Sequence, residues 1–194
     1  IPLGVLSAVH RDTWIDTTAK TVALLGQATP NFWLALLFIL VFSTLLQWLP
    51  AYGNATGWHL IMPAIVLGWY PAATQTRMIR SAMLDVLDSD YIRMARAVGI
   101  PERVLVWKYG LRNALIQLVT MLGVYFAALL GGAFIIETVF AWPGLGRTVV
   151  EAVFARDFPV VQAGVLFSAV LFVVANFLVD LSYTLIDPRV RRHG

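Results

Sequence analysis

The chain has 194 residues, 59% of them hydrophobic and only 13% charged, with a formal net charge of +3 and a mean hydropathy of +0.77. Ordinary globular chains carry about 45–50% apolar and about 25% charged residues, so this composition excludes a soluble domain, and its apolar and aromatic content excludes disorder. No cysteine and three scattered histidines offer neither a disulfide framework nor a metal-ligand pattern. We therefore expect an all-α integral membrane protein that binds no metal or cofactor of its own.

Four apolar segments are long enough to cross a bilayer core about 30 Å thick, which takes roughly 20 helical residues. They cover residues 22–49, 59–76, 114–136 and 160–179, and the last two contain no charge. Pro63 and Pro71 predict that the second span is kinked and packed inside a bundle. Residues 1–9 look like the tail of a further apolar segment. We expect four complete spans, the end of a fifth, and an N-terminally incomplete chain.

The links between these spans divide the positive charge unequally. Residues 10–21, 77–113 and 187–194 hold twelve of the fourteen Lys and Arg residues, whereas residues 50–58 and 137–159 hold two. Because cytoplasmic loops carry the excess of Lys and Arg, the first three segments, and with them the C-terminus, are predicted to be cytoplasmic. Aromatic residues at the opposite ends of the spans fit an outer interfacial belt: Trp48, Tyr52, Trp58, Trp142 and Phe158.

Two features inside the spans leave alternatives open. Small residues four apart within 127–132 could let a neighbouring helix approach closely, or could simply face lipid. Asp180 is an acid in an otherwise apolar stretch. Intramembrane acids often serve a transport pathway, but Asp180 is also close enough to the predicted cytoplasmic surface to pair with an arginine there.

The cytoplasmic link, residues 77–113, is too long for a simple turn and has an internal pattern. Tyr91, Met94, Ala95 and Val98 follow the spacing of one helix face, and Gly99 is placed to end that helix. Pro101 and Glu102 then open a second helix that continues into the third span.

Such a helix–bend–helix arrangement can pass a push from a soluble partner to a transmembrane helix. We expect a bulky side chain at Gly99 to straighten the bend. The alternative is an amphipathic helix that lies on the lipid surface, which basic residues also favour.

The outer link, residues 137–159, is patterned as well. Trp142, Pro143 and Gly144 predict a turn, after which apolar residues at helical spacing predict a short helix over 145–156. Arg147 and Glu151 are four residues apart and can pair on its exposed side. This helix either lines and closes an outer gate or only anchors the ends of the spans. The residues that set the helical spacing are Leu145, Val149 and Ala152, with Val153 and Arg156.

Several stretches resemble one protein family. DYIRMARAVGIPERVLVWKYGLRNAL at 90–115, ETVFAWPGLGR at 137–147, RDFPVVQAGVLF at 156–167 and NFLVDLSYTLIDPRVR at 176–191 resemble the membrane permease subunits of binding-protein-dependent ABC importers, in the dipeptide/oligopeptide/nickel branch. The general loop motif of that family, Glu-Ala-Ala-x-x-x-Gly, is kept at Ala95 and Gly99 but not at Arg93 and Met94. The resemblance covers the whole chain, 1–194, which corresponds to the C-terminal two thirds of such a permease.

The resemblance implies a type I-like transmembrane helix bundle in the bacterial or archaeal cytoplasmic membrane. It implies a second homologous permease subunit as partner, two ABC ATPase subunits that bind ATP and Mg²⁺, and an extracytoplasmic solute-binding protein. Peptides, nickel chelates or related small solutes are the implied substrates, and no nucleic acid is expected. The residues implied in ATPase coupling are Tyr91, Met94, Ala95, Arg96, Val98, Gly99, Glu102 and Arg103, and those expected at the outer gate are Trp142, Gly144, Arg147 and Glu151.

An enzymatic function is not expected. The sequence has no Gly-x-x-x-x-Gly-Lys-Ser/Thr phosphate loop, no His-Glu-x-x-His and no Gly-x-Ser-x-Gly, so ATP hydrolysis is assigned to partner subunits and no catalytic residue is predicted. A secondary transporter and a membrane scaffold are the competing functions. A secondary transporter is expected to carry intramembrane ionisable groups, and a scaffold has no need for a helix–bend–helix loop.

Overall fold

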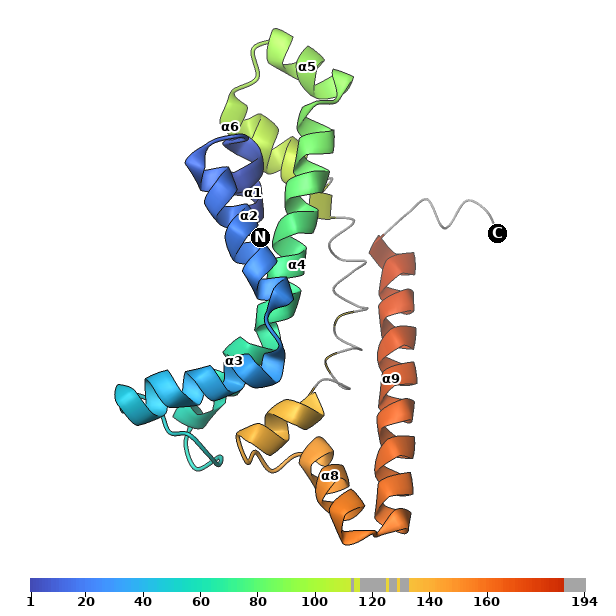
Figure 1. Cartoon of the computed structure of the whole chain (residues 1–194). Coiled ribbons are helices and arrows are strands. Elements are labelled where there is room, and N and C mark those ends of the chain that lie inside the picture. The colour runs from blue at the N-terminus through green and yellow to red at the C-terminus, as the bar shows by residue number, and fades with distance from the viewer. Residues whose placement is uncertain (113, 116–124, 126–128, 130–132, 187–194) are drawn as a thin grey trace. The chain divides into compact units, whose positions relative to one another are not determined.

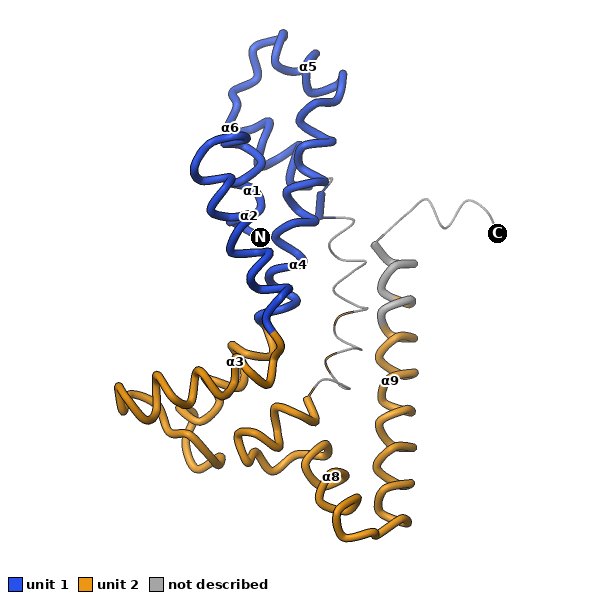
Figure 2. Tube along the Cα trace, in the orientation of Figure 1, with its two compact units in different colours: residues 1–29, 69–121 blue, residues 30–68, 122–194 orange. Residues whose placement is uncertain are grey.

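The computed structural model describes residues 1–112, 114–115, 125, 129 and 133–186, and all regular elements in these ranges are helical, as expected (Figure 1). Residues 1–29 with 69–121 form one compact unit, and residues 30–68 with 122–194 form another (Figure 2). Besides a helical stretch at 133–139, the elements are α1 Pro2–Val9, α2 Trp14–Ala28, α3 Asn31–Phe38, the π-helix η1 Ile39–Leu45, the 3₁₀-helix η2 Gly57–Leu60, α4 Ile61–Leu87, α5 Asp90–Ala97, α6 Glu102–Val104, the π-helix η3 Leu105–Gly110, α8 Leu145–Ala155 and α9 Phe158–Ile186.

The predicted first span is wrong as a single continuous helix. The chain breaks between α2 and α3, where Thr29 takes an extended conformation before Pro30, and helical structure ends at Leu45. The break has a local cause, because proline lacks the N–H that would continue α2 and its ring disfavours a helical residue before it.

The other predicted spans have different outcomes. By length and hydropathy, Phe158–Leu178 within α9 is the one helix in the described ranges that could cross a membrane alone, and α2 with α3–η1 adds a second if that bent pair is one span. The second predicted span begins near the start of α4, which runs on to Leu87 with Pro71 inside it. Most of 114–136, including the small residues at 127–132, lies outside the described residues. The four-span topology therefore stays a prediction.

In the first unit, α1 and α2 pack on α4 through small residues. A Cβ atom on Gly4 would lie 2.7 Å from the Thr76 carbonyl oxygen, and one on Gly26 would lie 2.6 Å from the Cβ atom of Ala73. Both helices can therefore approach α4 only with glycine at these positions. The surrounding apolar core joins α1, α4 and η3 and contains Val5, Ala8, Ile79, Ala82, Met83 and Val106.

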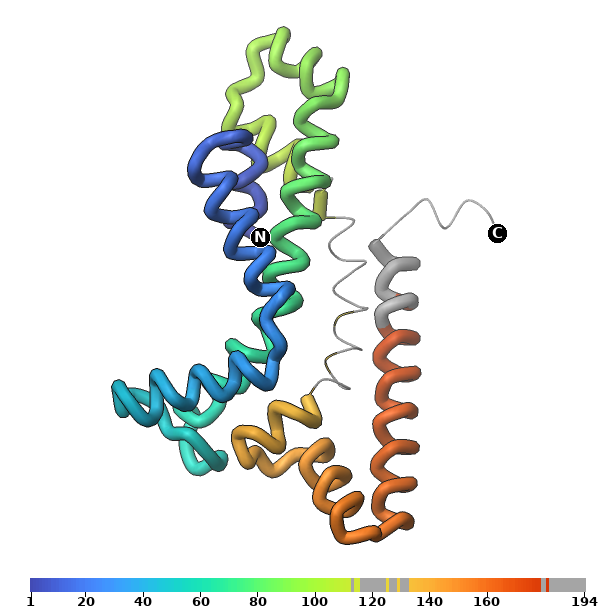
Figure 3. The backbone as a smooth tube through the Cα atoms, viewed as in Figure 1, coloured from blue at the N-terminus to red at the C-terminus, as the bar shows by residue number. Residues whose placement is uncertain are grey.

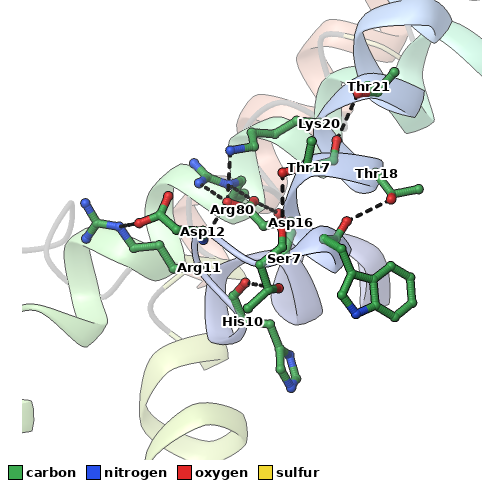
Figure 4. Close-up of polar contacts among 12 residues, drawn as sticks. Ser7, His10, Arg11, Asp12, Asp16, Thr17, Thr18, Lys20, Thr21 and Arg80 are labelled. Carbon is green, nitrogen blue, oxygen red and sulfur yellow. Dashed lines mark hydrogen bonds and ion pairs between the residues drawn. The ribbon is translucent and has the colours of Figure 1, made fainter.

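A buried carboxylate ties α1, α2 and α4 together (Figure 4). Asp16 of α2 is fully buried and accepts hydrogen bonds from Arg80 of α4, with Nε–Oδ1 and Nη2–Oδ2 distances of 2.6 and 2.8 Å. Ser7 of α1 donates to Oδ1 at 2.6 Å, Lys20 approaches Oδ2 at 3.0 Å, and the Asp12 backbone N–H donates to Oδ2 at 3.1 Å. Ser7 of α1 and Arg80 of α4 thus both bond to the Asp16 carboxylate of α2, which links the three helices through one buried group.

In the second unit, α8 packs against α9 with Val149 and Ala152 buried. Ile136 and Phe140, in and just after the 133–139 stretch, are also buried, and the Phe140 carbonyl accepts a 3.1 Å hydrogen bond from the Gly53 N–H. The side chains of α9 are almost all exposed along Phe158–Leu178, which leaves an apolar helix surface for lipid or a partner. Asp180 lies in α9, and its side chain is outside the described part of the structure.

We predict that Asp16→Asn destabilises the protein by about 2 kcal/mol. The amide group would point N–H donors at the Arg80 and Lys20 donors and remove their counter-charge. This loss of stability is smaller than the roughly 3–5 kcal/mol that removal of one partner of a fully buried ion pair costs. The reason is that 21% of the Arg80 side chain and 40% of the Lys20 side chain remain exposed. Thermal unfolding of the purified protein in detergent measures the change. Asp12→Asn, at an exposed carboxylate, is the control, and equal midpoints for both variants would contradict the prediction.

Candidate functional site

The segment predicted to be a cytoplasmic loop has the predicted helix–bend–helix form, α5 followed by α6, which can be followed by residue colour in Figure 3. Asp90 lies in the first turn of α5, where its carboxylate is stabilised by the positive end of the helix dipole. At the other end, the Gly99 N–H donates to the Arg96 carbonyl at 3.0 Å and the Ile100 N–H donates to the Ala95 carbonyl at 3.2 Å. This pair of bonds is the Schellman motif, and it requires the left-handed φ of +89° that Gly99 adopts.

The expected reason for glycine at position 99 needs correction. No atom lies within 4 Å of a Cβ built on Gly99, so a larger side chain would meet open space. The requirement is instead the positive φ angle, which residues with a branched Cβ rarely adopt. The bend is therefore built into the backbone of the loop.

The predicted apolar face of α5 points outward. Met94 and Val98 are 73% and 78% exposed, Tyr91 is also exposed, and Ala95 is half-buried. The side chain that holds α5 in place is Ile92, which is fully buried, and α5 contacts η3. The sequence analysis missed Ile92, because apolar residues occur on both sides of this short helix and their spacing does not tell which side faces the protein.

An ion pair closes the bend. Arg96 at the end of α5 donates to the Glu102 carboxylate at the start of α6 through Nε, and through Nη2 at 3.3 Å. The Arg96 guanidinium holds the pKa of Glu102 below its ordinary value, and Glu102 raises the pKa of Arg96. Because the pKa of Glu102 is lowered in the folded protein, the ion pair stabilises the folded loop at neutral pH. This stabilisation is lost only as the pH falls through the lowered pKa. Arg103, the remaining residue predicted for this site, is exposed on α6.

The short helix predicted over 145–156 is present as α8, Leu145–Ala155, with Gly144 as its N-cap. The predicted pair forms, with Arg147 Nε 2.6 Å from Glu151 Oε1, and Arg147 Nη1 also donates to the Ala141 carbonyl at 2.8 Å. Arg156 caps the helix in a left-handed conformation with a φ of +56°, so the helix ends just before the predicted limit.

Glu137 is the outer residue that the sequence analysis missed. Its carboxylate Oε2 accepts the backbone N–H of Arg147 at 3.1 Å, and its carbonyl accepts the N–H of the half-buried Trp142 at 2.8 Å. The carboxylate thus caps the N-terminus of α8 from a separate helical stretch, where negative charge is stabilised. A Cβ on Gly144 would overlap this carboxylate, which accounts for glycine there. Glu137 is followed by glycines seven and nine residues later, and that run is a signal that could have identified it.

Within the described residues, no three His, Cys, Asp or Glu side chains are grouped so that they could hold a metal ion. What the loop offers is an exposed apolar face on a short helix of fixed direction. What the outer segment offers is a helix fixed at both ends by hydrogen bonds.

We predict that Gly99→Val makes amide hydrogen exchange across residues 90–104 about tenfold faster, because a left-handed conformation costs a residue with a Cβ about 1–2 kcal/mol. The matched control is Gly99→Asn, since asparagine tolerates this conformation and the space around it is open. Exchange mass spectrometry of the purified protein measures both. Equally fast exchange in the two variants would mean that side-chain bulk, not the φ angle, is the constraint.

Known proteins match the chain over almost its whole length. Residues 1–192 match the family described as binding-protein-dependent transport system inner membrane component. A relative from Brucella abortus (strain 2308), whose name describes a peptide transport system permease protein, is 46% identical over 199 residues, which cover 98% of this chain and 63% of the relative. The glutathione transport system permease proteins GsiC of Pectobacterium atrosepticum and Escherichia coli (strain K12) are 47% and 45% identical to this chain. Each alignment covers 97% of this chain, and they cover 62% and 61% of the two relatives, respectively.

The chain therefore spans less than two thirds of the length of these relatives. Its all-helical structure and exposed apolar α9 agree with the description of the matching family as a membrane component. The family match over residues 1–192 and the high identity of the relatives show that the chain belongs to the binding-protein-dependent transport system inner membrane components, the permeases of such systems.

Proposed function

We propose that this chain forms part of one permease subunit of an ATP-driven importer. It would provide half of a translocation pathway together with a second, homologous permease. The family description and the names of the relatives support this function over a secondary transporter or a scaffold. Peptides, glutathione among them, are the substrate class that the names of the relatives support, and the solute-binding protein would make the final selection.

The observation that carries the proposal is the outward apolar face of α5 beside a fixed bend. Exposed Tyr91, Met94 and Val98 can fill an apolar cleft of a soluble ATPase, and each large apolar side chain that becomes buried contributes about 1.5–3 kcal/mol. Arg96, Glu102 and Arg103 would then lie at the rim, where charge pairs contribute about 0–1 kcal/mol. The apolar face is therefore expected to dominate the affinity.

Motion of the ATPase would reach the membrane through rigid elements. Ile92 fixes α5 to the loop, and the Gly99 bend fixes the direction of α6, which continues into η3. A displacement of α5 would thus move η3 and the residues that follow it. This mechanism places the loop, and also the C-terminus, on the cytoplasmic side, which the charge distribution between the links supports.

We predict that Ala95→Asp in the full-length permease abolishes solute uptake and weakens association with the ATPase at least tenfold, because a carboxylate would enter the apolar interface unpaired. Ala97→Asp makes the same chemical change on the same helix but away from the apolar face, and it is expected to retain both activities. Co-purification of the ATPase and uptake into proteoliposomes measure the two effects, and membrane insertion is checked in each variant. Full association and full uptake of Ala95→Asp would overturn the docking assignment.

For the outer segment we propose a gate formed by α8, with Trp142, Gly144, Arg147 and Glu151 at its N-terminal end. The anchoring contacts of Arg147 support this role, because a gate needs a helix that moves as one body. Phe154, which is 84% exposed near the other end of α8, offers a surface for the partner permease.

We predict that a disulfide between Phe154→Cys and a cysteine on the partner permease, placed across the pathway, blocks uptake while the complex stays assembled. Reduction of that disulfide should restore uptake, which serves as the internal control. Undiminished uptake with the crosslink fully formed would leave α8 with an anchoring role only. Crosslink yield on gels and uptake are measured on the same preparation.

A further inference from the structure

A cavity of about 360 Å³ between α2 and α4 is not used by the proposed coupling or gating. It is lined by Lys20, Leu24, Arg77, Arg80 and Ser81. Three of these five residues are cations, Ser81 adds a hydroxyl, and none is acidic. A concave site with this lining favours a ligand that carries negative charge and several acceptor oxygens.

The carboxylate nearest to this cavity does not neutralise it. Asp16 supplies one negative charge that both Arg80 and Lys20 contact, and Arg77 instead donates to the neutral Gln27 amide oxygen at 2.5 Å. Asp12 is a second acid on this side, but its carboxylate lies 3.4 Å from the guanidinium of Arg11. Asp12 also lies close enough to act electrostatically on Arg80, so the three lining cations face two negative charges, those of Asp16 and Asp12, and one positive charge remains in surplus at the cavity.

Donors remain for a ligand. Within the described residues, Arg80 uses Nε and Nη2 toward Asp16 and Arg77 uses Nη1 toward Gln27, which leaves N–H groups on both guanidinium groups. Lys20 has three N–H donors and directs one contact to Asp16. On the other side, Leu24 lines the cavity and is 56% exposed, so the polar site borders an apolar surface.

We propose that this cavity binds the phosphate diester of an anionic phospholipid, with its acyl chains along the exposed surface beside Leu24. The proposal rests on the proposed function in one respect, the placement of residues 10–21 and 77–113 at the cytoplasmic face. Basic pockets between transmembrane helices on that face are suited to anionic headgroups. A bound lipid would bridge α2 and α4 on the solvent side of the Asp16 cluster and would hold together the two helices that lead to the coupling loop.

The test uses the complete permease in its importer complex, delipidated in detergent. Native mass spectrometry compares the binding of phosphatidylglycerol with that of phosphatidylcholine with the same acyl chains. We expect phosphatidylglycerol to bind at least tenfold more tightly, which corresponds to about 1.4 kcal/mol, and Lys20→Gln/Arg77→Gln to remove that preference. Lys108→Gln/Arg112→Gln removes two exposed cations elsewhere and is expected to retain it.

Arg77→Gln alone is a second variant. Among the described residues Arg77 pairs with no carboxylate, so its loss leaves the Asp16 cluster intact. This variant should weaken phosphatidylglycerol binding severalfold, and Arg77→Lys should restore the binding. Equal binding of the two lipids, or an equal loss in the control double variant, would overturn the proposal. Displacement of phosphatidylglycerol by millimolar inorganic phosphate would show a soluble-anion site and overturn the lipid assignment. ATPase association is measured on the same samples, so failure of the proposed function is visible separately.

Discussion

Much of the first unit depends on the burial of one carboxylate. Asp16 is removed from water and must be compensated by protein donors, and these come from α1, α2 and α4 together. The hydrophobic effect alone would let these apolar helices slide along or rotate about one another at small cost. The fixed geometry of the Arg80–Asp16 pair removes that freedom, because a shift of one helical turn would separate the Arg80 guanidinium from the buried carboxylate. The close contacts at Gly4 and Gly26 also restrict sliding of the helices, because a Cβ atom at either position would clash with α4.

The loop that contains α5 and α6, proposed to couple to the ATPase, follows a different principle, since its geometry is set by local hydrogen bonds and not by a deep core. The Schellman bonds at Gly99 and the Arg96–Glu102 pair fix the angle between α5 and α6, and Ile92 is the buried side chain of α5. The other large apolar side chains here, Tyr91, Met94 and Val98, are left at the surface. An exposed apolar face on a rigid support is suited to docking, because little conformational entropy is lost when a partner covers it.

The sequence could predict those parts of the fold that depend on neighbours in the chain. The bend at Gly99, the start at Pro101 and Glu102, the outer helix and its Arg147–Glu151 pair all arise from residues within one or two helical turns, and all are present. The break at Pro30 is equally local, and the polar residues around it, Gln27, Thr29 and Asn31, mark it in the sequence between two apolar runs.

The features that could not be predicted join distant residues. Asp16 and Arg80 are 64 positions apart, and nothing in the periodicity of either helix connects them. Glu137 and Arg147 are 10 apart but belong to separate helical segments, so the cap could be found only once the turn between them had a geometry. Ile92 shows the remaining ambiguity, in which a pattern reveals that a helix has an apolar side but not which side is covered.

The hydrogen bonds around Glu137 also restrict how this segment can vary in length. The Glu137 carbonyl binds the Trp142 N–H, its carboxylate binds the Arg147 N–H, and the Arg147 guanidinium binds the Ala141 carbonyl, which closes residues 137–147 into overlapping rings. Insertion or deletion of one residue inside these rings would disturb at least two of the three bonds, because the rings overlap. Substitution of exposed side chains on α8 would break none of them. The length of this segment is therefore constrained by its backbone, whereas the exposed surface of α8 can change by side-chain substitution without loss of these hydrogen bonds.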